Sequence, residues 1–375
     1  MIDKEEREAV LRVMDRGILS GYKGNWSESF YGGEEVKALE KEWAEYFGVK
    51  HAIACNSATS GLWMACAAVG LGYEFEDRLV SSDEDPYIQV SIQELVEDEC
   101  VVSPYSMTCS ASIPLHFGAK PVFADIEEDY YCLDVKSIEE RITERTKAII
   151  VVDLFGQPYN ADEINVLAER KSKEYGHKIY IIEDAAQAAG AKYKGKYAGT
   201  LGDIGVYSLN VHKPIQCGEG GIVVTDDDEL ADKLRLVMNH AEAVTNNMVR
   251  QGEIFEGHNL CSFAGLNLRM TELSAAIARE QLKKLEGIIK IQQENAKYFP
   301  IKVREGCGHS FYRYVWIDNG LKGWEHEDKV NYKFHYITPI YQMPLFKSLG
   351  YDQHSCPVCE TVDENIVLAW LKEGI

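Results

Sequence analysis

Three short stretches of the sequence carry side chains that could do chemistry, and each follows an apolar run typical of a buried strand. The first is "CNSATSGL" (55–62), where small hydroxyl residues lead directly into a helical pattern. A helix N-terminus presents unpaired N–H groups and a positive dipole end, so Ser57, Ala58 and Thr59 could hold a phosphate group. Taken alone, a simple helix cap by Ser57 or Thr59 is the better explanation.

The second stretch, "IIEDAAQAAGA" (181–191), places Asp184 at the end of a very apolar strand. Burying a carboxylate is costly unless it is paired or hydrogen-bonded, so a cationic partner would explain its position. The ring N–H of a protonated pyridine is such a partner, and Gln187, one helical turn later, could face the same ligand. A capping aspartate followed by a structural glutamine is an equal alternative.

The third stretch, "YSLNVHKPIQCGEGGIVV" (207–224), ends a strand at Ser208 and carries Lys213 before a glycine-rich turn. A lysine in a desolvated pocket has a lowered amine pKa and becomes a nucleophile toward carbonyl groups, although most lysines are ordinary surface cations. Together the three stretches describe a site for pyridoxal 5'-phosphate, which needs an anchored phosphate, a carboxylate at the ring nitrogen and a lysine amine.

Apolar runs that alternate with amphipathic segments must position these side chains. Helices are expected at 59–70 and 161–176. The pattern indicates an α/β fold with a mostly parallel central sheet flanked by helices, in which ligands bind beyond the carboxyl ends of the strands. The expected strands are 51–55, 100–104, 121–126, 146–155, 178–186, 204–209 and 221–225.

Two segments depart from this alternation of apolar and amphipathic stretches. Residues 73–99 are acidic, lack a strong period and are interpreted as a surface insertion. Residues 271–298 predict one long helix capped by a threonine, and aromatic, strand-like pieces follow it. We therefore expect a large cofactor-binding domain over residues 1–264 and a smaller α+β C-terminal domain over residues 265–375.

The composition excludes some classes of function. The chain has 375 residues, 46% of them hydrophobic, and a formal net charge of −21, which argues against nucleic-acid binding. No apolar segment reaches the length of a membrane helix, and the charged N-terminus is unlike a signal peptide, so we expect a cytoplasmic protein without membrane contact. Cysteines in apolar runs are then expected to be reduced, buried and inert: Cys55, Cys66, Cys100 and Cys132.

Nearly the whole chain resembles the sugar aminotransferases of the DegT/DnrJ/EryC1/StrS family, in the three stretches above and in others beside them. That family has the pyridoxal phosphate-dependent transferase fold type I, and the resemblance implies the same fold here. The stretches that carry the resemblance follow in the expected order: 32–62, 118–134, 146–158, 183–225, 265–282 and "CPVCE" at 356–360.

The resemblance implies a role for each residue of the site. Lys213 would form the Schiff base with the cofactor, and Asp184 would pair with the pyridinium nitrogen. Gln187 would contact the cofactor ring and its phenolic oxygen. The phosphate would be bound by Ala58, Thr59 and Ser208 of one subunit and by Asn267 of the other, which implies a homodimer with shared active sites.

The resemblance also implies a reaction. Relatives with histidine at the lysine position are sugar 3-dehydrases. His212 lies beside Lys213 here, but the spacing to the glycine-rich turn places Lys213 at the catalytic position. This favours transfer of an amino group from an amino acid, with glutamate expected, to a keto-sugar carried on a nucleotide. Three residues are proposed to contact the substrate: Trp26, Tyr31 and His240.

Some features remain open. Met107 falls where relatives commonly carry an aromatic residue that stacks on the cofactor, with Tyr105 as a substitute. A sugar dehydrase and a non-catalytic cofactor-binding regulator of the same fold are alternatives. A structural zinc protein is a third, because "HSCPVC" (354–359) contains Cys-x-x-Cys, with Cys307 and His309 upstream; a lone Cys-x-x-Cys is weak support, so no metal is expected.

Overall fold

The computed structural model describes residues 2–24, 27–80, 88–241, 264–318 and 330–371. The chain folds into two compact units that interleave along the sequence. Unit 1 comprises residues 1–99, 113–120 and 208–283, and unit 2 comprises residues 100–112, 121–207 and 284–375. The predicted division into residues 1–264 and 265–375 stays a prediction.

In unit 1, two short buried strands lie where the apolar runs predict them. β1 (His51–Cys55) pairs antiparallel with β11 (Gly221–Thr225), and Cys55 lies opposite Gly221. The helices of unit 1 are α1 (Lys4–Arg16), η1 (Glu28–Tyr31), α2 (Glu34–Phe47), α3 (Ala58–Ala68), η2 (Ile113–Phe117), α7 (Asp228–Met238) and α9 (Glu272–Leu282). Because β1 ends only two residues before α3 begins, the helix start lies at the carboxyl end of the strand.

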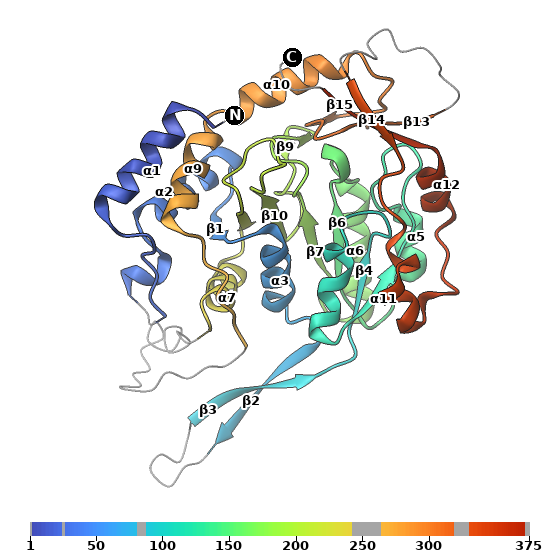
Figure 1. Ribbon diagram of the computed structural model, residues 1–375. Coiled ribbons are helices and arrows are strands. Elements are labelled where there is room, and N and C mark those ends of the chain that lie inside the picture. Colours follow the sequence, from blue (N-terminus) through green and yellow to red (C-terminus); the bar gives the residue numbers. More distant parts are fainter. Residues whose placement is uncertain (1, 25–26, 81–87, 242–263, 319–329, 372–375) are drawn as a thin grey trace. The chain divides into compact units, whose positions relative to one another are not determined.

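The acidic insertion forms a β-hairpin in unit 1. β2 (Tyr73–Val80) pairs antiparallel with β3 (Ile88–Leu95) over the full length of both strands. Figure 1 shows this pair as a narrow ribbon that extends beyond the end of α3. The segment interpreted as a surface insertion thus has regular structure, which the sequence did not reveal because charged residues obscure the apolar alternation of the two strands.

Unit 2 contains the parallel part of the central sheet, as predicted. Its strands follow the order β10-β7-β6-β4-β5, and β6 lies parallel to β7, which lies parallel to β10. The strands are β4 (Glu99–Val102), β5 (Lys120–Phe123), β6 (Thr146–Val152), β7 (Tyr180–Asp184) and β10 (Ile204–Ser208, of which Ser208 belongs to unit 1). Nearly every residue of β6 and β7 is buried, as expected for parallel strands covered on both faces.

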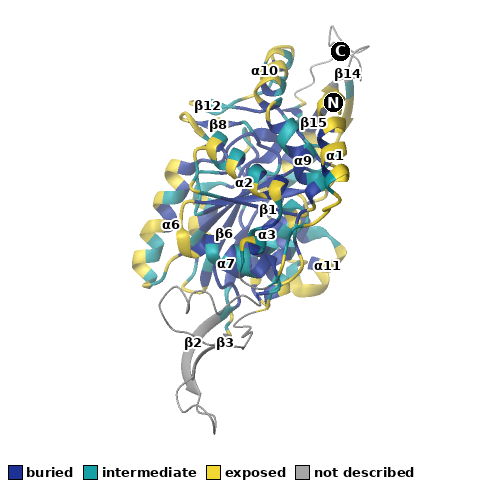
Figure 2. Ribbon diagram, turned by 90° about the vertical axis from the view of Figure 1, so that its left-hand side faces the viewer, coloured by how far each residue is buried: buried dark blue, intermediate teal, exposed yellow. Residues whose placement is uncertain are grey.

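The helices of unit 2 bury apolar faces against this sheet. α5 (Val135–Arg141) and α6 (Ala161–Tyr175) share one hydrophobic core with β6 and β7 through Ile138, Ile164 and Ile149. Figure 2 shows β6 in the colour of buried residues and α6 with exposed residues on its outer side. The other helical segments are α4 (Cys109–Ser112), η3 (Leu154–Gly156), α10 (Leu285–Ala296), η5 (Ile340–Gln342), α11 (Pro344–Phe346), η6 (Lys347–Tyr351) and α12 (Pro357–Asn365).

Two small antiparallel sheets complete unit 2, with the orders β12-β8-β9 and β13-β15-β14. Their strands are β8 (Lys192–Tyr193), β9 (Lys196–Tyr197), β12 (Cys307–Gly308), β13 (Tyr314–Ile317), β14 (Val330–Phe334) and β15 (Ile366–Leu371). The single helix predicted over 271–298 is wrong. Thr271 caps α9 as expected, but the helix ends at Leu282 and α10 begins at Leu285, because the turn at Lys283 and Lys284 interrupts the helical hydrogen bonds.

Candidate active site

The start of α3 in unit 1 has the geometry expected of an anion site. Ser57 has extended backbone angles, and its hydroxyl accepts a hydrogen bond from the N–H of Ser60 at 3.1 Å, so the predicted cap is present. The first N–H groups of a helix have no intrahelical acceptor and point out of its end. Ala58 and Thr59 occupy these first positions, half-buried and exposed respectively.

Gly221 lets β11 pass directly against this helix start. A Cβ atom added to Gly221 would lie 2.6 Å from the carbonyl carbon of Ser57 and 2.7 Å from the nitrogen of Ala58. Both contacts are with backbone atoms, which cannot rotate aside. The glycine of the "GEGG" turn is therefore needed for close packing at the helix start.

Ser208 is the last residue of β10, and Lys213 lies in the loop that connects β10 to β11; both belong to unit 1. The hydroxyl of the buried Ser208 accepts a hydrogen bond from the N–H of Asn210 at 3.3 Å. The N–H of Lys213 donates to the carbonyl oxygen of Asn210 at 2.9 Å. Lys213 is half-buried whereas His212 is exposed. The choice of Lys213 over His212, made from spacing, stays a prediction.

Asn267 lies on an extended segment that runs beside the end of β1 within the same unit. The N–H of Asn56 donates to the carbonyl oxygen of Leu268 at 2.8 Å, and Cys55 forms an isolated bridge with Arg269. Asn267 is exposed, and its side-chain oxygen accepts a hydrogen bond from Arg269 Nε at 2.9 Å. Its proposed role toward a partner subunit stays a prediction.

In unit 2, Asp184 is the last residue of β7 and Gln187 follows three positions later; each is only 4% exposed. Asp184 Oδ2 accepts a hydrogen bond from the hydroxyl of Ser110 at 2.8 Å, and Oδ1 accepts one from the N–H of Ala186 at 3.2 Å. Gln187 Oε1 accepts a hydrogen bond from the N–H of Phe155 at 2.8 Å. Each side chain is thus oriented by at least one group far away in the sequence, Ser110 for Asp184 and Phe155 for Gln187.

Tyr336 is a residue of this region that the sequence reasoning missed. Its hydroxyl accepts a hydrogen bond from Gln187 Nε2 at 3.3 Å, and its ring lies edge-on to Phe155, with 4.9 Å between centroids. Burial raises the pKa of the Tyr336 phenol to about 12, so the phenol stays neutral at physiological pH. No local pattern marks this residue, because Tyr336 lies 149 positions from Gln187.

Two further buried carboxyl groups adjoin Asp184. Asp153 and Glu183 are fully buried, and the N–H of Asp153 donates to the carbonyl oxygen of Asp184 at 3.1 Å. Glu183 accepts three backbone hydrogen bonds, from the N–H groups of Gly199, Leu201 and Gly202. Desolvation raises the pKa values of both Asp153 and Glu183. The sequence shows both carboxyl groups near strand ends but gives no sign that they meet.

The residues proposed for stacking and substrate contact lie in different surroundings. Met107 is 54% exposed, whereas Tyr105 is fully buried and donates its hydroxyl to Asp363 at 2.9 Å, so Tyr105 belongs to the interior of unit 2. Tyr31 is half-buried beneath the guanidinium of Arg235.

Two other residues proposed for substrate contact give less structural information. His240 is half-buried with a positive φ of 64°. Trp26 lies outside the described residues. The substrate roles of Tyr31, His240 and Trp26 stay predictions.

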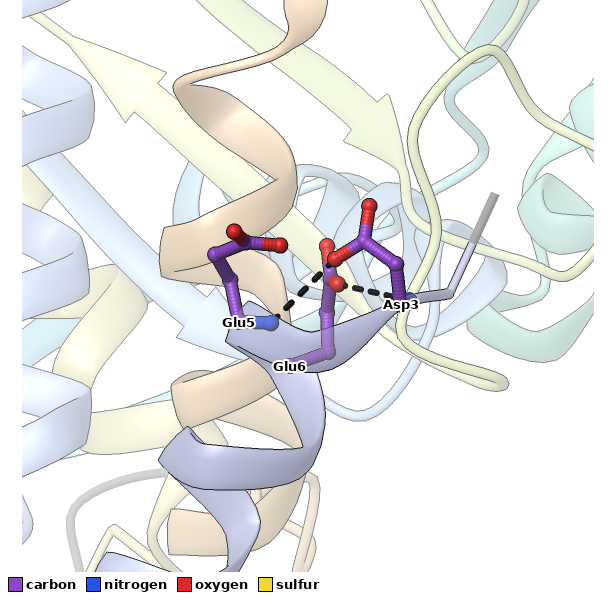
Figure 3. A group of neighbouring side chains, drawn as sticks. All are labelled: Asp3, Glu5 and Glu6. Atoms are coloured by element: carbon purple, nitrogen blue, oxygen red, sulfur yellow. Dashed lines mark hydrogen bonds between the residues drawn. The ribbon is translucent and has the colours of Figure 1, made fainter.

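The structure gives no support to a zinc site at the Cys-x-x-Cys pair. Cys356 Sγ lies 3.5 Å from His354 Nε2, but no further metal-ligating group joins them in the described part of the chain. Within those residues, one group of three is close enough to share an ion: Asp3, Glu5 and Glu6, drawn in Figure 3. These carboxylates form the N-terminal cap of α1, because Asp3 Oδ1 accepts from the N–H of Glu5 and Glu6 Oε2 accepts from the N–H of Asp3.

Each unit, taken by itself, holds groups that suit one part of pyridoxal phosphate. In unit 1, a helix start, a buried hydroxyl and a half-buried lysine provide donors for a phosphate and an amine for an aldehyde. In unit 2, the oriented carboxylate of Asp184 suits a protonated ring nitrogen. The residues present therefore fit this cofactor.

Comparisons with known proteins agree with this interpretation. The model of the DegT/DnrJ/EryC1/StrS aminotransferase family matches residues 2–310. The chain is 33% identical over 298 residues to the spore coat polysaccharide biosynthesis protein SpsC of Bacillus subtilis (strain 168), covering 79% of this chain and 66% of that protein. It is 35% identical over 285 residues to GDP-perosamine synthase of Caulobacter vibrioides, covering 76% and 63%. The chain thus spans slightly less than two thirds of the length of these relatives.

A solved structure agrees over almost the full length. The aminotransferase from Psychrobacter cryohalolentis superposes with a TM-score of 0.77 at 26% identity, covering 98% of this chain and 91% of that one. The α/β fold with a mostly parallel sheet is thereby confirmed. No helix within the described residues has the length and apolar character to cross a membrane. The match of the family model over most of the chain shows that this protein belongs to the DegT/DnrJ/EryC1/StrS aminotransferase family.

Proposed function

We propose that this protein is a pyridoxal phosphate-dependent aminotransferase that moves an amino group from an amino acid, glutamate in the first instance, to a nucleotide-linked keto-sugar. Family membership supports the reaction class and the cofactor. The relative named GDP-perosamine synthase supports a nucleotide-linked sugar as acceptor. Nine described cysteines are free, which is consistent with a reducing compartment, and we propose the cytoplasm.

The observation that carries the proposal is the buried carboxylate of Asp184, oriented by two hydrogen-bond donors at the end of β7. An oriented buried carboxylate calls for a cation, and a protonated pyridine ring would provide one. Gln187, held by Phe155, would turn its amide toward the phenolic oxygen of the ring. Ser208 and the N–H groups of Ala58 and Thr59 would bind the phosphate.

When bound, the cofactor supplies an electron sink that stabilises negative charge on the carbon that loses its proton. The chain itself provides acid–base chemistry and orientation. Lys213 Nζ would take the proton from the α-carbon of the amino donor as a general base and deliver it to the C4′ carbon of the cofactor as a general acid. Asp184 would keep the ring nitrogen protonated, and the donors around the phosphate would fix the cofactor in place.

The lysine assignment is tested by locating the cofactor on the chain. The purified protein is loaded with pyridoxal phosphate, reduced with borohydride, digested and analysed by mass spectrometry. We expect one stable adduct, on Lys213, and its loss in Lys213→Ala. The matched control His212→Ala keeps the adduct. An adduct on another lysine, or the same yield in Lys213→Ala, contradicts the assignment.

The reaction class is tested by following the visible spectrum as glutamate is added. A spectral change that a keto-sugar nucleotide then reverses supports the aminotransferase. A protein that binds cofactor but consumes a sugar only with an added reductase system supports the dehydrase alternative. A protein that binds cofactor but responds to no amine donor supports the regulator.

We also propose a homodimer in which Asn267 completes the partner's phosphate site. Its exposed position beside the end of β1 is consistent with a role across an interface. Asn267→Ala is expected to weaken cofactor binding while the dimer persists in analytical ultracentrifugation. A monomeric wild-type protein with full cofactor affinity contradicts the shared site.

A further inference from the structure

The carboxylate of Asp184 is contacted by a serine that belongs to a short chain of hydroxyl groups. Ser110 Oγ lies 2.8 Å from Asp184 Oδ2, and Ser106 Oγ lies 2.8 Å from Ser110 Oγ. All three residues are buried. Ser110 lies in α4, 74 positions before Asp184, so the contact depends on the tertiary fold.

The direction of these hydrogen bonds follows from the chemistry of the groups. An ionised carboxylate can only accept, so the single hydroxyl proton of Ser110 must point to Asp184. Ser110 can then only accept from Ser106, which makes Ser106 the donor in the contact between the two serines. Ser106 Oγ also lies 3.1 Å from the carbonyl oxygen of Met107, so its proton is shared between the two acceptors.

The hydroxyl proton of Ser110 therefore points to the carboxylate of Asp184, and Ser106 donates to Ser110 with the part of its hydrogen bond that Met107 does not take. A hydrogen bond donated to a carboxylate favours its ionised form and lowers its basicity, and a second donor behind the first strengthens the bond by polarisation. A weakly basic carboxylate leaves a shared proton on its partner. A more basic one draws that proton away.

We propose that Ser110 is a positioning residue that keeps Asp184 ionised. The proton between Asp184 and a bound pyridine ring then stays on the ring nitrogen. Ser106 contributes by donating a hydrogen bond to Ser110. This inference rests on the proposed function. It concerns residues of this chain that act through Asp184, and it predicts that the proton position changes while the cofactor remains bound.

The decisive measurement is the ¹⁵N chemical shift of ring-labelled pyridoxal phosphate bound to the protein, since this shift distinguishes a protonated from a neutral ring nitrogen. We expect a protonated nitrogen in the wild type and a clear displacement toward the neutral value in Ser110→Ala. Ser110→Thr retains a hydroxyl group and is expected to restore the wild-type shift. Ser112→Ala, in the same short helix, is the matched control and should leave the shift unchanged.

Kinetics provide a second readout. Weaker protonation of the ring should lower kcat for the first half-reaction about tenfold in Ser110→Ala, which corresponds to about 1.4 kcal/mol, while KM for the amino donor changes little. A Ser110→Ala protein with bound cofactor, a wild-type ¹⁵N shift and unchanged kcat overturns the proposal. If Ser110→Ala does not fold, Ser106→Ala is measured in its place, and a smaller displacement in the same direction is required.

The outcomes separate this inference from the proposed function. A wild-type protein that does not bind pyridoxal phosphate contradicts the proposed function itself. A wild-type protein that binds it with a protonated ring, together with a Ser110→Ala protein that does the same, contradicts only the role of Ser110.

Discussion

Asp153 and Glu183 are fully buried carboxyl groups that interact with each other, and the charge of Glu183 raises the pKa of Asp153 beyond the effect of burial alone. Glu183 accepts three backbone N–H groups, which favour its ionised form. Asp153 Oδ1 accepts from the N–H of Tyr159, whereas no N–H or O–H donor among the described residues reaches Oδ2. A proton on Asp153 Oδ2, donated to Glu183, would satisfy this oxygen and leave one negative charge on the pair.

A proton shared in this way predicts a pH-dependent stability. Desolvation raises the pKa values of both carboxyl groups, so the folded state binds more protons than the unfolded chain above pH about 4. The contribution of the pair is fully present below that pH and is lost as the pH rises toward the raised folded-state value. Within that window the wild type should lose about 1.4 kcal/mol per pH unit relative to Asp153→Asn, since one extra proton is bound. Urea unfolding at several pH values measures the difference.

Two variants separate the shared proton from a general effect of mutation. Asp153→Asn places a permanent N–H where the proton was and should raise stability at neutral pH by about 1 kcal/mol. Glu183→Gln turns an N–H₂ group toward backbone donors and should cost about 2 kcal/mol. Equal losses in both variants would show that no proton is shared.

Gln187 and Tyr336 provide a second prediction, because the two polar ends of Gln187 have different partners. Gln187→Glu keeps an acceptor for the Phe155 N–H but loses the N–H₂ group and adds a charge near Asp184. Because this charge would be buried and unpaired, we expect the free energy of unfolding to fall by about 1–3 kcal/mol. The cofactor affinity should be about tenfold weaker, which corresponds to about 1.4 kcal/mol. Fluorescence titration with pyridoxal phosphate measures the affinity. Tyr336→Phe, which removes only the acceptor for Gln187 Nε2, should cost about 1 kcal/mol of stability with little change in affinity.

Local sequence patterns were sufficient to predict strand bounds and helix caps, because residues close together in the sequence determine these features. β1 and β11 form over the residues predicted, 51–55 and 221–225, because continuous apolar runs end sharply at polar or glycine residues. The cap of α3 by Ser57 and the cap of α9 by Thr271 follow from the same local chemistry. The family could be predicted because the resemblance covers many short sequence stretches that occur in a fixed order.

Contacts between distant residues could not be predicted in this way. Ser110 reaches Asp184 across 74 positions, and Tyr336 reaches Gln187 across 149. Such pairs leave no periodic signal, since tertiary packing alone brings them together. The break between α9 and α10 was missed for a related reason, because both sides of the break have helical composition and only the hydrogen bonds are interrupted.

The buried ion pair of Glu40 and Arg235 yields a third prediction. Arg235 Nη2 donates to Glu40 Oε2 at 2.9 Å and to the carbonyl oxygen of Ala52 at 3.2 Å, linking α7 to α2 and β1. The two side chains are 13% and 8% exposed for Arg235 and Glu40. Removing one partner leaves a buried charge uncompensated, so Arg235→Ala should lower the free energy of unfolding by about 3–5 kcal/mol.

An exposed pair is the matched control for this measurement. Lys50 and Asp228 form an ion pair on the surface of the same unit, with 55% and 68% of their side chains exposed. Lys50→Ala should cost at most about 1 kcal/mol, because solvent screens the interaction. Denaturant unfolding of both variants makes the comparison, and a similar small loss in each would mean that the buried pair contributes no more than the exposed one.

Gly221 tests the helix start as a phosphate site. A methyl group in Gly221→Ala would meet backbone atoms of Ser57 and Ala58 at 2.6–2.7 Å, so β11 or the first turn of α3 must move. Overpacking of this kind costs about 1–3 kcal/mol, and displaced N–H groups should weaken cofactor affinity about tenfold or more. Gly287→Ala, in the first turn of α10 with open space around it, is the control and should stabilise the fold by up to about 1 kcal/mol. If Gly221→Ala loses stability but binds pyridoxal phosphate with wild-type affinity, the start of α3 does not hold the phosphate.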